Sequence, residues 1–139
     1  MKKKKVCLLA FYDNQGYILL NHRKSGLNLN EDYWEIIGGG IEQNEQPQEA
    51  IKREIKEELN YDIGEEEDEL NFVQQFQFTD KNVEFEVYFF KAKFPGFHKF
   101  ADSSEVFISN LKTFSLEEAL NLNLLPICRY IIEVSRTKP

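Results

Sequence analysis

Apolar and polar positions along the chain predict strands on both sides of one long helix. Two pairs of apolar segments resemble β-hairpins. In each pair a polar turn lies between the two segments, at residues 13–16 in the first pair and at residues 79–82 in the second. The segments whose apolar runs or alternation are typical of strands are residues 6–12, 17–21, 34–37, 70–78 and 83–94. Alternation in the fourth of these segments places Phe72, Phe76 and Phe78 on one face.

The remaining segments predict one further strand and a terminal helical region. Residues 105–108 are expected to form a short strand. Ser115, with Glu118 three residues later, forms a capping-box pattern that starts a helix, and Pro126 restarts or kinks it. The polar residues 25–33 are expected to form a loop bordering a ligand pocket. Strands, a crossover helix, more strands and a terminal helix predict an α/β sandwich with a mixed sheet.

The central helix is predicted from Pro47, which suits a first helical turn, to Leu59. At about 100° per residue, its apolar stripe is flanked by the carboxylates of Glu54, Glu57 and Glu58. Their repulsion costs a few tenths of a kcal/mol per pair and opposes folding, and a hard divalent cation would remove that cost. A solvated surface helix is the alternative, because lysines give the same helix a mixed charge.

The residues before and along this helix form a spaced motif. Its members are Gly39, Glu45, Arg53, Glu54, Ile55, Glu57 and Glu58. The motif resembles the signature of the Nudix hydrolases: glycine, five residues, glutamate, seven residues, Arg-Glu, an aliphatic residue, any residue, and Glu-Glu. With residue types used at about 5–7% each, six fixed matches have a chance probability on the order of 10⁻⁷ per start point, and a Glu-rich chain weakens this only about tenfold or somewhat more.

The chain departs from the family pattern at four positions. Asn60 replaces the usual glycine, Tyr61 an aliphatic residue, Asn44 a common glycine, and Ile37 a common proline. Asparagine tolerates a left-handed backbone better than other residues with a side chain, so both asparagines are expected to keep the glycine geometry. None of the four changes removes an expected metal ligand.

The resemblance implies the Nudix fold and hydrolysis of a diphosphate linkage in a nucleoside diphosphate derivative, with Mg²⁺ or Mn²⁺ as cofactor. By position, it implies that Glu57 and Glu58 are metal ligands and that Glu54 is a ligand or the base that activates water. It also implies that Gly38 supplies a backbone carbonyl ligand.

Further roles follow from the same resemblance. Arg53 and Glu45 correspond to an ion pair that orients the helix. The residues expected to let the backbone approach phosphate are Gly38, Gly39 and Gly40.

A further acidic residue from a later loop is expected at the site. Glu105 is the first candidate, and Glu84 and Glu86 are the alternatives. His22 could supply an imidazole early in the chain, but an exposed strand-end residue is the preferred interpretation.

Composition limits the class of protein. A chain of 139 residues suits one domain over residues 1–139, and a formal net charge of −7 argues against a large nucleic-acid footprint. Cys7 and Cys128 lack metal-ligand spacing and are expected to be buried free thiols of a cytoplasmic protein. No apolar segment is long enough to span a membrane, and a monomer or homodimer acting on a small nucleotide is expected.

Several substrates and one non-enzymatic role remain open. A nucleoside-triphosphate pyrophosphohydrolase of the MutT-like kind is the first hypothesis, and a dinucleoside-polyphosphate or nucleotide-sugar hydrolase is the second. A non-catalytic nucleotide-sensing module is a third, which the complete set of glutamates argues against. A purely structural interaction domain would not need the glycine and glutamate spacing.

Overall fold

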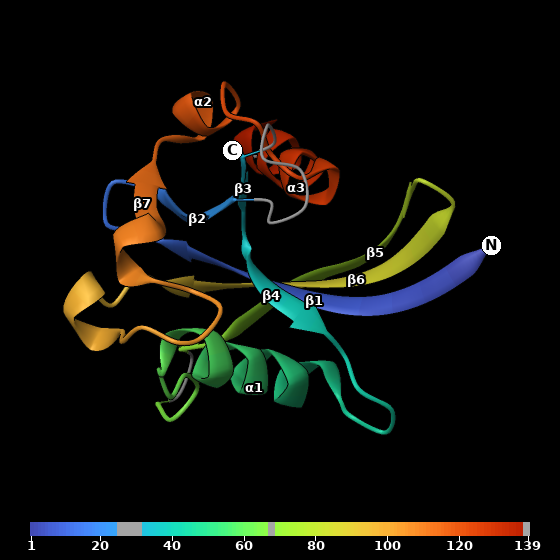
Figure 1. The fold of residues 1–139 in the computed structure, drawn as a ribbon, viewed down its shortest axis with the longest axis horizontal. Coiled ribbons are helices and arrows are strands. Elements are labelled where there is room, and N and C mark those ends of the chain that lie inside the picture. Colours follow the sequence, from blue (N-terminus) through green and yellow to red (C-terminus); the bar gives the residue numbers. More distant parts are fainter. Residues whose placement is uncertain (25–31, 67–68, 138–139) are drawn as a thin grey trace.

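The structure, a computed structural model, describes residues 1–24, 32–66 and 69–137 (Figure 1). Its strands are Lys2–Tyr12 (β1), Ile18–Lys24 (β2), Asp32–Glu35 (β3), Ile37–Gly40 (β4), Asn71–Asp80 (β5), Val83–Lys93 (β6) and Leu111–Phe114 (β7). Its α-helices are Pro47–Leu59 (α1), Leu116–Ala119 (α2) and Pro126–Thr137 (α3), and short 3₁₀ turns cover Phe97–Lys99 and Ile108–Asn110. None of the helices in these ranges is long and apolar enough to cross a membrane.

The strand β1 organises the sheet. On one edge it runs parallel to β6 along its whole length, from Lys2 opposite Val83 to Tyr12 opposite Lys93. On the other edge it pairs with β4 over residues 6–9 and with β2 at Tyr12. The strands of the described residues thus form one mixed sheet in the order β3-β2-β1-β6-β5, with β4 added on β1 and β7 on β2.

Helices cover both faces of this sheet: α1 lies on one side, and α2 and α3 lie on the other (Figure 1). The cluster under α1 includes Leu9, Ile51 and Ile55, all fully buried. The cluster under α3 includes Leu20 and Ile132, also fully buried. Each such side chain contributes about 1.5–3 kcal/mol when it is buried, so both layers stabilise the sheet. The predicted α/β sandwich with a mixed sheet is confirmed.

The three glycines at residues 38–40 belong to a strand, β4, and no secondary structure was predicted for them from the sequence. Residues 34–37, predicted as one strand, are split between β3 and β4, and Asp32 and Tyr33 belong to β3 rather than to the predicted loop. The rest of that loop, residues 25–31, lies outside the described residues. A Cβ atom at Gly38 would collide with the carbonyl oxygen of Cys7, so the lack of a side chain lets β4 pair with β1.

The predicted face assignment within β5 is wrong at Phe72. A β-bulge between Phe72 and Gln74 shifts the register against β6. Phe72 therefore packs against Phe90, on the α1 side, whereas Phe76 contacts Tyr130 of α3. A bulge inserts one extra residue, which inverts the alternation beyond it.

The C-terminal predictions are confirmed in part. Ser115 and Glu118 form the predicted capping box, with their reciprocal hydrogen bonds at 3.1 and 3.0 Å, and Pro126 begins α3. The strand expected at residues 105–108 is absent from the described structure, and β7 follows it instead. Asp102 and Ser103 accept hydrogen bonds from backbone N–H groups of this segment, which removes those donors from strand pairing.

Candidate active site

The helix α1 begins and ends as its sequence predicts. Pro47 occupies the first turn, and Asn60 caps the C-terminus with φ 54° and ψ 37° while its N–H donates to the Lys56 carbonyl. Asn44, in the turn before α1, has φ 66°. The expectation that both asparagines keep a left-handed backbone is confirmed.

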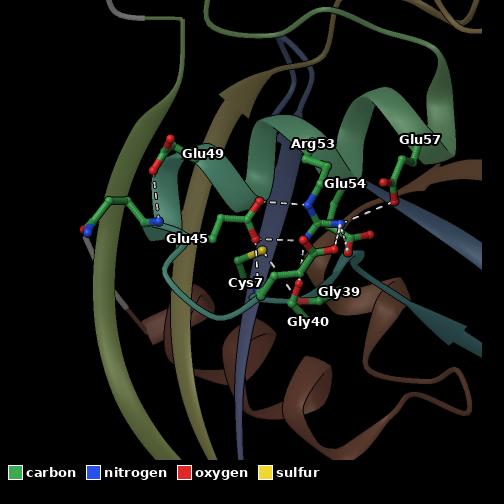
Figure 2. A network of polar contacts seen from close by, with 10 residues as sticks. Cys7, Gly39, Gly40, Glu45, Glu49, Arg53, Glu54 and Glu57 are labelled. Atoms are coloured by element: carbon green, nitrogen blue, oxygen red, sulfur yellow. Dashed lines mark hydrogen bonds and ion pairs between the residues drawn. The ribbon is translucent and has the colours of Figure 1, made fainter.

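Arg53 lies at the centre of a network that ties α1 to the glycine strand (Figure 2). Its Nε and Nη2 donate to the two carboxylate oxygens of Glu45 at 2.8 and 3.0 Å. Nη2 also donates to the Gly40 carbonyl at 2.8 Å. Nη1 donates to Glu54 at 3.0 Å and to Glu57 at 3.4 Å. The expected pairing of Arg53 with Glu45 is therefore present, and it braces helix, turn and strand together.

The bidentate pair fixes the charge state of Glu45. Hydrogen bonds from Arg53, followed by the backbone N–H of Glu42 at 2.9 Å, lower the pKa of Glu45 to about 2. The hydrogen bond to Glu45 is likewise the main cause of a raised Arg53 pKa. Both groups stay charged at neutral pH, which suits a permanent structural contact.

The glycine strand makes room for a carboxylate. The Glu54 carboxyl group occupies the space that a Cβ atom at Gly39 would need, and its side chain is 12% exposed. Burial raises the pKa of Glu54, and the hydrogen bond from Arg53 opposes that shift. Gly39 thus brings Glu54 against the strand, while the predicted approach of Gly38, Gly39 and Gly40 to phosphate stays a prediction.

Glu58 is the least satisfied charge of the helix. It is 4% exposed, and among the described residues its Oε2 has no hydrogen-bond partner. Burial, and next the charges of Glu54, Glu35 and Glu105, raise the pKa of Glu58 to about 8. A buried carboxyl group without a partner is stabilised either by a proton or by a cation.

Two residues were not predicted from the sequence as part of this region: Glu35, whose charge acts on Glu58, and its partner Asn21. Glu35 of β3 accepts hydrogen bonds from Arg23 at 2.9 Å and from Asn21 at 3.2 Å, both on β2. Asn21 is 2% exposed, and its Oδ1 has no partner in the described part of the chain. The signal was available, because Asn21 follows Leu19 at a position whose side chain faces the α1 layer.

The charge of Glu105 acts on this cluster. Its charge contributes to the raised pKa values of both Glu54 and Glu58. Glu86, by contrast, accepts a hydrogen bond from Tyr88 at 2.6 Å and lies 3.7 Å from the Lys5 ammonium. Glu84 lies on the same strand, opposite Lys3. This arrangement favours Glu105 over Glu84 and Glu86 as the added acid, and its role stays a prediction.

Three residues with reactive side chains play other parts. His22 stacks on Trp34 with ring centroids 4.5 Å apart, and its Nε2 lies 3.6 Å from an Asp32 oxygen. Cys7 and Cys128 are buried free thiols, as predicted. Burial raises the pKa of Cys7 to about 12, so this thiol stays neutral beside Gly39.

The donor set suits a divalent cation, although its side chains are not arranged around one. Among the residues that the structure describes, no three acidic, histidine or cysteine side chains are placed to hold a metal ion. Arg53 instead holds Glu54 and Glu57. The orphaned oxygen of Glu58, and the space that Gly39 leaves for Glu54, still fit a hard cation, which prefers carboxylate oxygen.

A cavity opens beside the glycine strand, on the α3 side of the sheet. It has a volume of about 250 Å³, and its lining includes Gly38, Gly39 and Glu35. Val6 and Phe85 contribute apolar walls. A larger hollow of about 640 Å³ lies elsewhere on that side, and its lining contains none of the predicted site residues. Of these two cavities, the smaller is therefore the one lined by predicted site residues, Gly38 and Gly39.

Comparisons with known proteins agree with this fold. The chain is 38% identical over 53 residues to an RNA pyrophosphohydrolase of Hydrogenovibrio crunogenus, a match covering 36% of this chain and 32% of that protein. The solution structure of the E. coli ORF135 protein superimposes with a TM-score of 0.71 at 24% identity, covering 98% and 90% of the two chains. The crystal structure of a MutT protein from Methanosarcina mazei superimposes with a TM-score of 0.71 at 19% identity, and the match covers 99% of this chain and 97% of that chain. The family model described as NUDIX domain matches residues 1–133, and the chain belongs to that family.

Proposed function

We propose that this protein hydrolyses a diphosphate linkage in a nucleoside diphosphate derivative, with a nucleoside triphosphate as the first candidate substrate. The buried carboxyl group of Glu58, whose Oε2 has no hydrogen-bond partner among the described residues, carries this proposal. A fold gains nothing from such a group, since a buried charge without a partner costs stability. A ligand cation that completes the cluster would explain its presence.

The proposed roles divide the motif residues into those that bind metal and those that position the helix. Glu57 and Glu58, with the Gly38 carbonyl, would hold Mg²⁺ or Mn²⁺, and Glu54 is a ligand or the base that takes a proton from water. When bound, the ion neutralises charge that develops on the phosphate oxygens. Glu105 adds a further negative charge from its loop. Arg53 and Glu45 act as positioning residues, because each satisfies the other.

The reaction then needs only one displacement. A water oxygen forms a bond to phosphorus, and the bridging P–O bond breaks on the opposite side. The leaving group departs with the bonding electrons as a phosphate or pyrophosphate, and the water proton passes to a carboxylate of the cluster. The cavity lined by Val6 and Phe85 would receive the apolar faces of a nucleobase while the phosphates reach the glycine strand.

A second candidate is removal of pyrophosphate from the 5′ end of RNA. The Hydrogenovibrio crunogenus relative is described as an RNA pyrophosphohydrolase, although the match spans about a third of its length. Alternation along β1 places Lys2 and Lys4 on the same face as Val6, which lines the cavity. Nucleotides beyond the first could follow these lysines, although the net charge of −7 opposes a long contact.

A substrate panel tests both candidates. Nucleoside triphosphates, a dinucleoside polyphosphate, a nucleotide sugar and a short 5′-triphosphate RNA would be incubated with Mg²⁺ or Mn²⁺, and products read by phosphorus NMR. We expect hydrolysis of at least one compound and its loss in EDTA. Lys2→Glu with Lys4→Glu should weaken only the reaction on RNA. No turnover of any compound, or turnover in EDTA, would contradict the proposal.

A further inference from the structure

The side chain of Asn60 makes contacts that a glycine at the same position could not make. Its Nδ2 donates to the carbonyl oxygens of Asp102 at 2.9 Å and Ala101 at 3.3 Å. The Ala101 N–H in turn donates to the Leu59 carbonyl at 3.0 Å. Three hydrogen bonds therefore join the C-terminus of α1 to residues 101–102.

The segment that follows this contact is itself ordered by local hydrogen bonds. The Ser103 hydroxyl accepts from the N–H groups of Glu105 at 3.2 Å and Val106 at 3.0 Å. The Ser103 N–H donates to the Val106 carbonyl at 2.9 Å. Val106 is 1% exposed and belongs to the core cluster under α1. Glu105 is therefore held between a core residue and the anchor at Asn60.

Glu105 directly precedes Val106, which packs in one core cluster with Ile55 and Leu59 of α1. The charge of Glu105 also adds to the raised pKa values of Glu54 and Glu58. Its own side chain is exposed, so backbone contacts of the loop set where its carboxylate can reach. We propose that Asn60 is a positioning residue, which uses its side-chain amide to fasten the loop of residues 101–106 to α1 and so holds Glu105 at the acidic cluster. The functional part of this inference rests on the proposed hydrolysis.

Asparagine is suited to both tasks at once. Its left-handed backbone, φ 54°, ends the helix as glycine would, and its amide supplies two donors. Aspartate has a similar shape and tolerates the same backbone, but its carboxylate would face two carbonyl oxygens without a donor. Two substitutions therefore separate the backbone role from the side-chain role: Asn60→Gly and Asn60→Asp.

Hydrogen exchange tests the anchor without any assumption about activity. In Asn60→Gly and Asn60→Asp we expect faster exchange of the Ala101, Ser103, Glu105 and Val106 amides, by about five- to tenfold, the scale of losing an exposed hydrogen bond. Asn82→Gly is the matched control, since Asn82 has φ 65° in the β5–β6 turn. Unchanged exchange in both Asn60 variants would overturn the anchor, even if no substrate is found.

A double-mutant cycle then tests the link to Glu105. We expect Asn60→Gly to lower kcat about five- to tenfold with KM changed less than about twofold. In a Glu105→Gln background the same substitution should have no further effect, because the two residues act as one unit. Full additivity of the two losses would show that Asn60 does not act through Glu105.

Discussion

Two parts of the α1 surface differ in whether their charged groups have hydrogen-bond partners. Around Arg53, the guanidinium has acceptors in Glu45, Glu54 and Gly40, and Glu45 is held ionised. Five residues further along, Glu58 is buried with an oxygen that has no partner among the described residues. A completed network needs no ligand and stabilises the fold, whereas an incomplete one is explained by a ligand that completes it.

The largest effect is expected when the incomplete part is neutralised. Glu58→Gln should lower kcat by about 10²-fold or more, the scale of losing a main electrostatic stabiliser of the transition state. Steady-state kinetics at saturating metal, with the substrate found in the panel, would measure it. Glu133→Gln, an exposed carboxylate on α3, is the control and should be neutral. Wild-type turnover in Glu58→Gln would remove Glu58 from the mechanism.

A substitution in the completed network around Arg53 should instead lower the free energy of unfolding. Arg53→Lys cannot reproduce the bidentate contact with Glu45, so the free energy of unfolding should fall by about 1–3 kcal/mol. Urea unfolding in EDTA measures this loss without a contribution from metal, since Arg53 also contacts Glu54 and Glu57. The matched control is Arg136→Lys, whose partner Glu117 lies 3.3 Å away at an exposed position; its loss should stay below about 0.5 kcal/mol. A loss at Arg53 no larger than that of the control would contradict the structural role of the Arg53–Glu45 pair.

Glu57 should show the smallest change in stability. Its side chain is 58% exposed and lies 3.4 Å from Arg53, so it is not crowded as the helix wheel suggested. Glu57→Gln should change the free energy of unfolding in EDTA by no more than about 0.5 kcal/mol. Stabilisation above about 1 kcal/mol, by the same urea measurement, would show that the three glutamates repel each other as a set.

Much of this arrangement could be predicted because it depends on local spacing. The apolar positions Ile51, Ile55 and Leu59 correctly predicted the buried face of α1. The motif correctly predicted the contact between Arg53 and Glu45. The left-handed backbone at Asn44 and Asn60 could be predicted because it depends on the steric preferences of a single residue. These features depend on residues within one helix and the turn before it.

The parts that were missed depend on contacts between distant segments. The Glu35 contacts with Arg23 and Asn21 need the pairing of β2 with β3. The wheel put Glu57 and Glu58 on one flank, but packing against the sheet buries Glu58 and exposes Glu57. The strand formed by the glycines depends on β1 lying beside them. Sequence spacing alone does not specify these neighbours.

In the proposed function, Glu58 is a buried carboxylate that is kept for a cation. Its folded pKa of about 8, raised from 4.5, means that the folded protein holds a proton which the unfolded chain has lost. The metal-free wild type should therefore lose stability relative to Glu58→Gln as pH rises from about 4.5 to about 8. The difference should be small near the lower value and on the order of a few kcal/mol near the upper one.

Urea unfolding of wild type and Glu58→Gln at about pH 5 and about pH 8, each in EDTA and in Mg²⁺, measures this most directly. At the higher pH, Glu58→Gln should be the more stable protein in EDTA. Mg²⁺ at about 100 times its Kd should then stabilise the wild type by about 2.7 kcal/mol and the variant by much less. Equal stabilisation of both proteins by Mg²⁺, or a variant no more stable than wild type in EDTA at about pH 8, would contradict the claim.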